Sequence, residues 1–69
     1  MKKLSVSLSG HQTSITLEPE FIDTLKRIAI IRGTSIASII CEIDNNRAPN
    51  TNLSSAIRVW ILNWVISNK

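Results

Sequence analysis

The side chains whose type and spacing best suit a chemical role are three hydrogen-bonding residues at alternate positions. Gln12, Ser14 and Thr16 alternate with apolar residues in SGHQTSITLEPEF, residues 9–21. Successive side chains of a β-strand point to opposite faces, so these three would share one face. Such a row can donate and accept hydrogen bonds, which favours recognition of a partner over catalysis.

No catalytic or metal-binding constellation accompanies this row. Asp44, Glu42 and His11 lack the spacing of a catalytic triad, and the sequence has no glycine-rich phosphate loop. His11 and Cys41, the only histidine and cysteine, are too far apart to form a ligand cluster. We therefore expect no enzyme activity, no metal, no cofactor and no small-molecule substrate.

Two alternating runs in residues 4–17 would position the hydrogen-bonding row. The apolar positions are even-numbered before Gly10 and odd-numbered after it: Leu4, Val6 and Leu8, then Thr13, Ile15 and Leu17. A shift of one residue inverts every side chain, so a bulge or a turn must lie near Gly10 and His11. One bent strand and a small hairpin both satisfy this pattern.

Three helices are expected after the strand region, in a single domain of residues 1–69. They span about 19–32, 35–45 and 53–67. Pro19 suits a first helical turn and Gly33 suits a helix end. Thr34 or Ser35 can cap the second helix; for the third, the candidates are Asn52 and Ser54.

The third helix predicts self-association. It is apolar over most of its circumference, with Trp60, Ile61 and Trp64 on its main face. A chain of 69 residues that is 43% hydrophobic cannot cover such a helix on all sides. We therefore expect these residues to pack in an oligomer, as a homodimer or a tetramer.

Charge and hydropathy are compatible with a cytoplasmic protein that binds nucleic acid. The net charge is +3 and the pI is about 9.6, a mildly basic balance. No signal peptide is expected, because the residues after Lys2 and Lys3 alternate rather than form an apolar run. The longest apolar stretch is far below the roughly 20 residues of a membrane span, so no membrane contact is expected.

The order of these elements resembles the ribbon-helix-helix superfamily of bacterial and phage DNA-binding proteins. The matching segments are TSITLEPEFIDTLKRIA, residues 13–29, and RGTSIASIICEI, residues 32–43. The family's pattern positions correspond to Leu17, Phe21, Leu25, Gly33 and Ser35. The segments GHQTS and NLSSAIRVW resemble the alphaproteobacterial subgroup, which adds a C-terminal helix.

The resemblance implies a mainly α fold with a short N-terminal strand. Two chains would form an intertwined dimer by pairing strands into an antiparallel ribbon, with Ile15 and Leu17 packed in the dimer. The outward face of the ribbon would enter the DNA major groove. Gln12, Ser14 and Thr16 then correspond to the base-reading positions, since Gln can pair with adenine and hydroxyls can bond several base edges.

The resemblance also implies a phosphate anchor at the start of the second helix. The matching positions are Thr34, Ser35 and Ile36, where free N–H groups and the helix dipole favour an anion. Lys2 and Lys3 are expected in a flexible start of the chain, with a DNA-contacting arm as the alternative. His11 is expected in a turn, and DNA contact is an alternative for it too.

The resulting hypothesis is a transcriptional repressor that binds double-stranded DNA sequence-specifically. One alternative is the antitoxin of a toxin–antitoxin pair, which uses the same DNA-binding core. That class usually has a charged, disordered C-terminal segment, whereas residues 53–66 are apolar and helix-like. The other alternative is a protein-interaction module of the same fold, because the strand lacks the arginine and lysine of many relatives.

Overall fold

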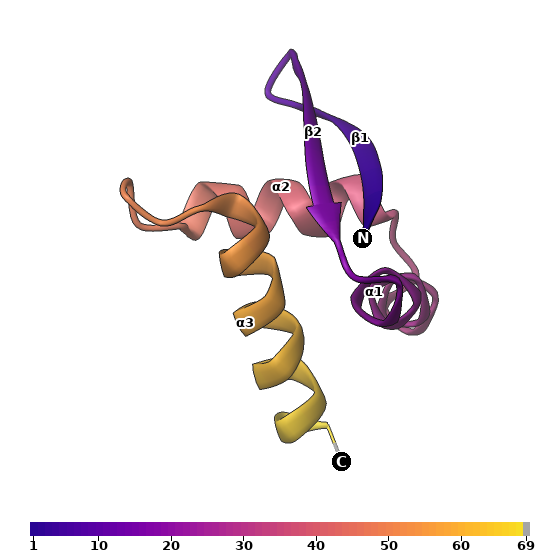
Figure 1. The fold of residues 1–69 in the computed structure, drawn as a ribbon. Helices are drawn as coiled ribbons and strands as arrows, with labels where there is room; N and C mark the ends of the chain where they lie inside the picture. Colours follow the sequence, from indigo (N-terminus) through magenta and orange to yellow (C-terminus); the bar gives the residue numbers. More distant parts are fainter. Residues whose placement is uncertain (69) are drawn as a thin grey trace.

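The computed structural model describes residues 1–68 as a β-hairpin followed by three helices (Figure 1). Strands β1 (Lys2–Leu8) and β2 (His11–Leu17) precede the helices α1 (Pro19–Arg32), α2 (Ile36–Asn46) and α3 (Leu53–Ser67). The antiparallel ribbon, the helix pair and the additional C-terminal helix confirm the predicted fold class.

A two-residue turn joins the strands. Ser9 and Gly10 have φ angles of 50° and 82°, the positive values that both central residues of a type I′ turn require. This turn matches the right-handed twist of paired strands, and glycine adopts its conformation without steric cost. Of the two arrangements that the sequence left open, the structure contains the hairpin.

The register of the hairpin accounts for the parity switch around Gly10. The pairing runs from Lys2 opposite Leu17 to Leu8 opposite His11. Each pair joins an even-numbered residue of one strand to an odd-numbered residue of the other, and directly opposed residues share a face. Both strands of this ribbon belong to the same chain. The pairing of strands between two chains, which the resemblance implied, stays a prediction.

The helix ends follow from local side chains and backbone geometry. Pro19 begins α1, and Gly33 ends it in the left-handed conformation with φ 67°. The N–H of Gly33 donates to the Ile30 carbonyl at 3.1 Å, and that of Thr34 donates to the Ala29 carbonyl at 2.9 Å, closing the helix in the pattern of a Schellman motif.

The other two helices begin at side-chain caps. The Ser35 hydroxyl accepts a hydrogen bond from the Ser38 N–H at 3.1 Å. The side-chain Oδ1 of Asn52 accepts one from the Ser55 N–H at 3.3 Å. Each cap satisfies an N–H group that the first helical turn leaves without an intrahelical partner.

One hydrophobic core joins the hairpin to all three helices. β1 packs on α2, β2 packs on α3, and α1 packs on both α2 and α3. The largest fully buried side chains come from four of the five elements and are Leu17, Leu25, Ile28, Ile39, Ile40 and Ile57. α3 is therefore part of the core rather than an appendage to it.

The residues expected to pack in an oligomer lie in or against this single-chain core. Ile15, Leu17 and Ile61 are only 5%, 0% and 3% exposed. Trp60 and Trp64 are half-buried and pack against the core. The hairpin and α3 cover one another, so one chain buries side chains that we had assigned to contacts between chains.

Candidate nucleic-acid interface

One face of the hairpin carries six exposed polar side chains, here called the polar face. They form three directly opposed pairs: Lys3 with Thr16, Ser5 with Ser14, and Ser7 with Gln12. The apolar side chains of the opposite face pack on the helices. Strands of seven residues give a ribbon about 20 Å long, and its turn projects beyond α2 (Figure 1).

The polar face has the chemistry of a surface that binds base edges. Lys3 is its only charged residue and none of its residues is acidic. Glutamine can pair bidentately with adenine, and serine and threonine can donate or accept toward several base edges. The major groove is about 12 Å wide and admits a two-stranded ribbon. The face can therefore approach DNA without placing an acid against phosphate.

Three residues of the polar face were missed or misplaced by the sequence reasoning. Ser5 and Ser7 were not assigned a role, and Lys3 was expected in a flexible start of the chain. The structure instead places Lys2 and Lys3 in β1, where they pair with Leu17 and Thr16. The parity switch, combined with Ser9-Gly10 as a two-residue turn, was the signal that could have placed them.

Lys2 and His11 are not on the polar face. Lys2 lies opposite Leu17 and His11 lies opposite Leu8, so the alternation of the strands directs both to the other side of the ribbon. Both side chains are exposed at opposite ends of the hairpin. The structure therefore brings together Gln12, Ser14 and Thr16, and separates His11 and Lys2 from them.

The predicted phosphate anchor coincides with the start of α2. Thr34 and Ser35 are exposed and Ile36 is half-buried. The Thr34 N–H is engaged by the Ala29 carbonyl, and the Ser35 hydroxyl caps the helix. The N–H groups of Ile36 and Ala37, in the first turn, have no acceptor within the helix. The N–H groups open to an anion are therefore those of Ile36, one of the three predicted positions, and of Ala37, the residue after it.

Three of the arginines are held in ion pairs within the chain. Arg32 contacts Glu42 at 3.1 Å, Arg47 contacts Asp44 at 2.7 Å, and Arg58 contacts Glu18 at 2.9 Å. Arg32 also lies 5.7 Å from the centre of the Trp60 ring, within the range of a cation–π contact. These cations serve internal contacts, which leaves Lys3 as the charge displayed by the polar face.

The Arg58–Glu18 pair fixes the end of the hairpin to α3. Glu18 follows β2 directly and occupies the N-cap position of α1, where its side chain makes no capping hydrogen bond. Arg58 lies 40 positions later in the sequence. The hydrogen bond from the Arg58 guanidinium, followed by a backbone hydrogen bond, lowers the pKa of the Glu18 carboxyl below its ordinary value. The pair thus contributes to stability while Glu18 is ionised.

We expect Glu18→Gln to lower stability at pH 7 and to have a smaller effect in acid. A lowered folded-state pKa stabilises the protein above the unfolded-state pKa, and this contribution disappears as the pH falls through the folded-state value. Urea unfolding of both proteins between pH 7 and pH 3 measures the difference. In an Arg58→Met background the same substitution should have little effect. If the stability difference between the parent and Glu18→Gln grew as the pH fell, the result would contradict the Arg58–Glu18 pair.

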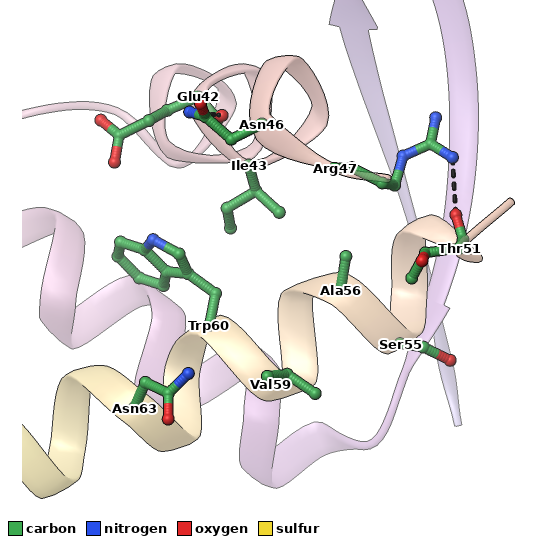
Figure 2. A pocket seen from close by; sticks show the side chains of 10 residues that line it. All are labelled: Glu42, Ile43, Asn46, Arg47, Thr51, Ser55, Ala56, Val59, Trp60 and Asn63. Atoms are coloured by element: carbon green, nitrogen blue, oxygen red, sulfur yellow. Dashed lines mark hydrogen bonds between the residues drawn. The ribbon is translucent and has the colours of Figure 1, made fainter. Parts of the chain in front are cut away.

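A groove of about 440 Å³ lies between α2 and α3 (Figure 2). Arg47 lies at one end, where it donates a hydrogen bond to the Thr51 carbonyl at 2.6 Å as well as contacting Asp44. Ile43, Ala56 and Trp60 form an apolar part of its lining. Arg47 is therefore engaged in holding the α2–α3 loop, and the groove is mainly an apolar hollow.

Two further features bear on the kinds of site that residues 1–68 can form. No helix there is both long enough and apolar enough to cross a membrane. Within the same residues, no group of three or more His, Cys, Asp or Glu side chains is placed to hold a metal ion.

Comparison with known proteins identifies the family of the chain. A model described as a ribbon-helix-helix domain matches residues 1–65. No curated protein and no solved structure gave a match. The matched residues include the whole hairpin, α1, α2 and nearly all of α3. The chain therefore belongs to the ribbon-helix-helix family.

Proposed function

We propose that this protein is a homodimeric transcriptional repressor that binds double-stranded DNA sequence-specifically in the cytoplasm. The polar face of the hairpin enters the major groove and reads base edges. Proteins with this domain are generally DNA-binding transcription regulators or antitoxins. The observation that carries the proposal is the polar face itself: six exposed residues in three opposed pairs, with one lysine and no acid.

Each group at the interface has a separate task. Gln12, Ser14 and Thr16 read bases, with Ser5 and Ser7 extending the same surface. Lys3 neutralises a phosphate at the edge of the groove. The first turn of α2 holds a second phosphate through the N–H groups of Ile36 and Ala37, next to the Thr34–Ser35 cap. Because phosphate contacts set register and base contacts set specificity, both are needed.

The decisive experiment selects duplexes from a random DNA pool with the purified protein. Binding of the selected duplexes is then measured as salt is raised. We expect a short enriched motif, often doubled, and a linear fall of log affinity with log salt. If no motif were enriched and all binding were lost at modest salt, the protein would bind DNA only by nonspecific charge attraction. That result would overturn the proposal.

Lys3→Gln should weaken binding to all duplexes and flatten the salt dependence. Each lysine that contacts a phosphate contributes about 0.9 to the slope of log affinity against log salt. Lys26→Gln is the matched control, because it removes the same charge from an exposed position on α1. Equal slopes for the two variants would show that Lys3 does not contact the DNA backbone.

The antitoxin alternative receives less support from the C-terminal segment. A toxin-wrapping segment of that class is usually charged and disordered before it meets its partner. Here α3 begins at the Asn52 cap, contributes fully buried Ile57 to the core, and contains Arg58 as its only charged residue. Co-purification of a small protein partner is the observation that would favour the antitoxin instead.

A further inference from the structure

Glu18 is the single residue between β2 and α1, and it is held from two directions. Its backbone carbonyl accepts hydrogen bonds from the N–H groups of Phe21 and Ile22, at 3.0 and 3.1 Å, in the first turn of α1. Its side-chain Oε1 accepts a hydrogen bond from Nε of Arg58 on α3 at 2.9 Å. The junction where the hairpin leaves the helices is therefore tied to α1 by the backbone and to α3 by one side chain.

The other contacts that hold the hairpin are apolar. Its buried side chains, which pack on the helices, are Val6, Leu8, Ile15 and Leu17. Of the ion pairs within residues 1–68, the Arg58–Glu18 pair is the one that reaches the end of the hairpin. Hydrophobic contact is non-directional, whereas a hydrogen bond has a preferred distance and angle. The apolar contacts attach the hairpin, and the ion pair is the contact suited to fixing its angle.

The polar face extends far from this junction, so a small change of angle has unequal effects along it. At about 3.4 Å per residue, Gln12 lies about 17 Å from Leu17 along β2, and Thr16 lies about 3 Å from it. At those distances, a rotation of about 5° at the base moves Gln12 by about 1.5 Å and Thr16 by only about 0.3 Å. Hydrogen bonds form over about 2.7–3.2 Å. The rotation would therefore break a base contact of Gln12 and preserve one of Thr16.

The exposure of the pair also favours a role in geometry. The Arg58 and Glu18 side chains are 28% and 41% exposed, and ion pairs with that access to water usually add little to stability. The pair nevertheless joins residues that are 40 positions apart. Its loss should leave the chain folded and change how the hairpin is oriented.

We propose that Arg58 is a positioning residue: acting through Glu18, it sets the angle between the hairpin and the helices, and thereby determines how selectively the distal half of the polar face reads DNA. The first part concerns the free protein, and only the second part rests on the proposed function. α3 then has a task besides completing the core, because it carries the side chain that orients the polar face.

The orientation is tested without DNA, by residual dipolar couplings of backbone amides in the hairpin and the helices. Arg58→Met should rotate the hairpin against the helices, or widen its range of orientations, with the parent's helix content retained. Arg47→Met is the matched control, because it removes the same charge and breaks an ion pair with Asp44 at the end of α2. Its hairpin should keep the parent's orientation. An unmoved hairpin in Arg58→Met would overturn the proposal.

Two substitutions of Glu18 test the same contact from the other side. Glutamine retains an oxygen that can accept the hydrogen bond from Arg58, whereas alanine does not. Glu18→Gln should therefore keep the parent's hairpin orientation, and Glu18→Ala should reproduce the change seen in Arg58→Met. Glu18→Ala also replaces Arg58→Met if that variant does not fold. A parent-like orientation in Glu18→Ala would refute the positioning role.

The effect on DNA reading is measured with duplexes that the parent selects from a random pool. Gln12→Ala and Thr16→Ala first identify the base pair that each residue reads. Arg58→Met should then lower the base preference at the Gln12 position at least about fivefold and change that at the Thr16 position by less than about twofold. Arg47→Met should preserve both preferences. Equal losses at the two positions, or no loss at either, would contradict a change of hairpin angle.

The two kinds of measurement separate this proposal from the proposed function. If the parent selects no duplex, the proposed function fails, and the hairpin orientation in the free protein still decides the role of Arg58. If the parent selects a motif but Arg58→Met leaves both the orientation and the base preferences unchanged, the proposed function stands and the positioning role is excluded.

Discussion

Ile57→Ala is expected to lower the free energy of unfolding by about 2–5 kcal/mol, the usual cost of truncating a fully buried isoleucine. Ile57 is 0% exposed and belongs to α3, which packs against α1, α2 and β2. A chain of this length has a total stability of about 3–10 kcal/mol. The substitution should therefore remove a large share of the free energy of unfolding. Urea unfolding at 25 °C measures the loss.

Ile30→Ala is the matched control, because Ile30 is also helical but is 80% exposed. Its cost should stay below about 1 kcal/mol, since little apolar surface leaves the core. The comparison between the two variants decides whether α3 is an essential part of the core. If Ile57→Ala were as mild as Ile30→Ala, α3 would be an accessory helix, and the hairpin would depend on α1 and α2 alone.

Local signals in the sequence were sufficient to predict the elements of the fold and their order. Pro19 and Gly33 each act within a few residues through backbone geometry, and the hydroxyl of Ser35 caps α2 in the same local way. The parity switch around Gly10 was also readable, because a two-residue turn pairs even with odd positions. The switch did not by itself distinguish a hairpin from a bent strand, since both shift the alternation by one residue.

Contacts between distant residues could not be read in the same way. Arg58 and Glu18 are 40 positions apart, and no periodicity connects them. Ile61 was expected between chains, but it is only 3% exposed in a single chain, where α3 packs against α1, α2 and β2. Which apolar face of α3 meets the core depends on how the helices pack together. For the same reason, the sequence showed the exposed apolar side of α3 only as residues continuing around the helix.

Ser14→Glu should reduce affinity for a selected duplex by at least about 100-fold. Ser14 lies opposite Ser5, in the central pair of the polar face. A good base contact contributes about 1–3 kcal/mol of discrimination, and a dimer would lose it twice. A carboxylate can only accept hydrogen bonds, as can phosphate oxygens, so it adds repulsion to the lost contact. Fluorescence anisotropy at fixed salt measures the affinity.

Ser67→Glu separates this effect from a change in net charge. It adds the same acid to an exposed serine at the end of α3, outside the hairpin. If the polar face reads DNA, this control should retain nearly all of the parent's affinity while Ser14→Glu loses it. Equal losses would mean that only the chain's overall positive charge attracts DNA. Affinity unchanged in both would exclude the centre of the polar face as the contact surface, because a carboxylate there would have to lose the serine's contact with no effect on binding.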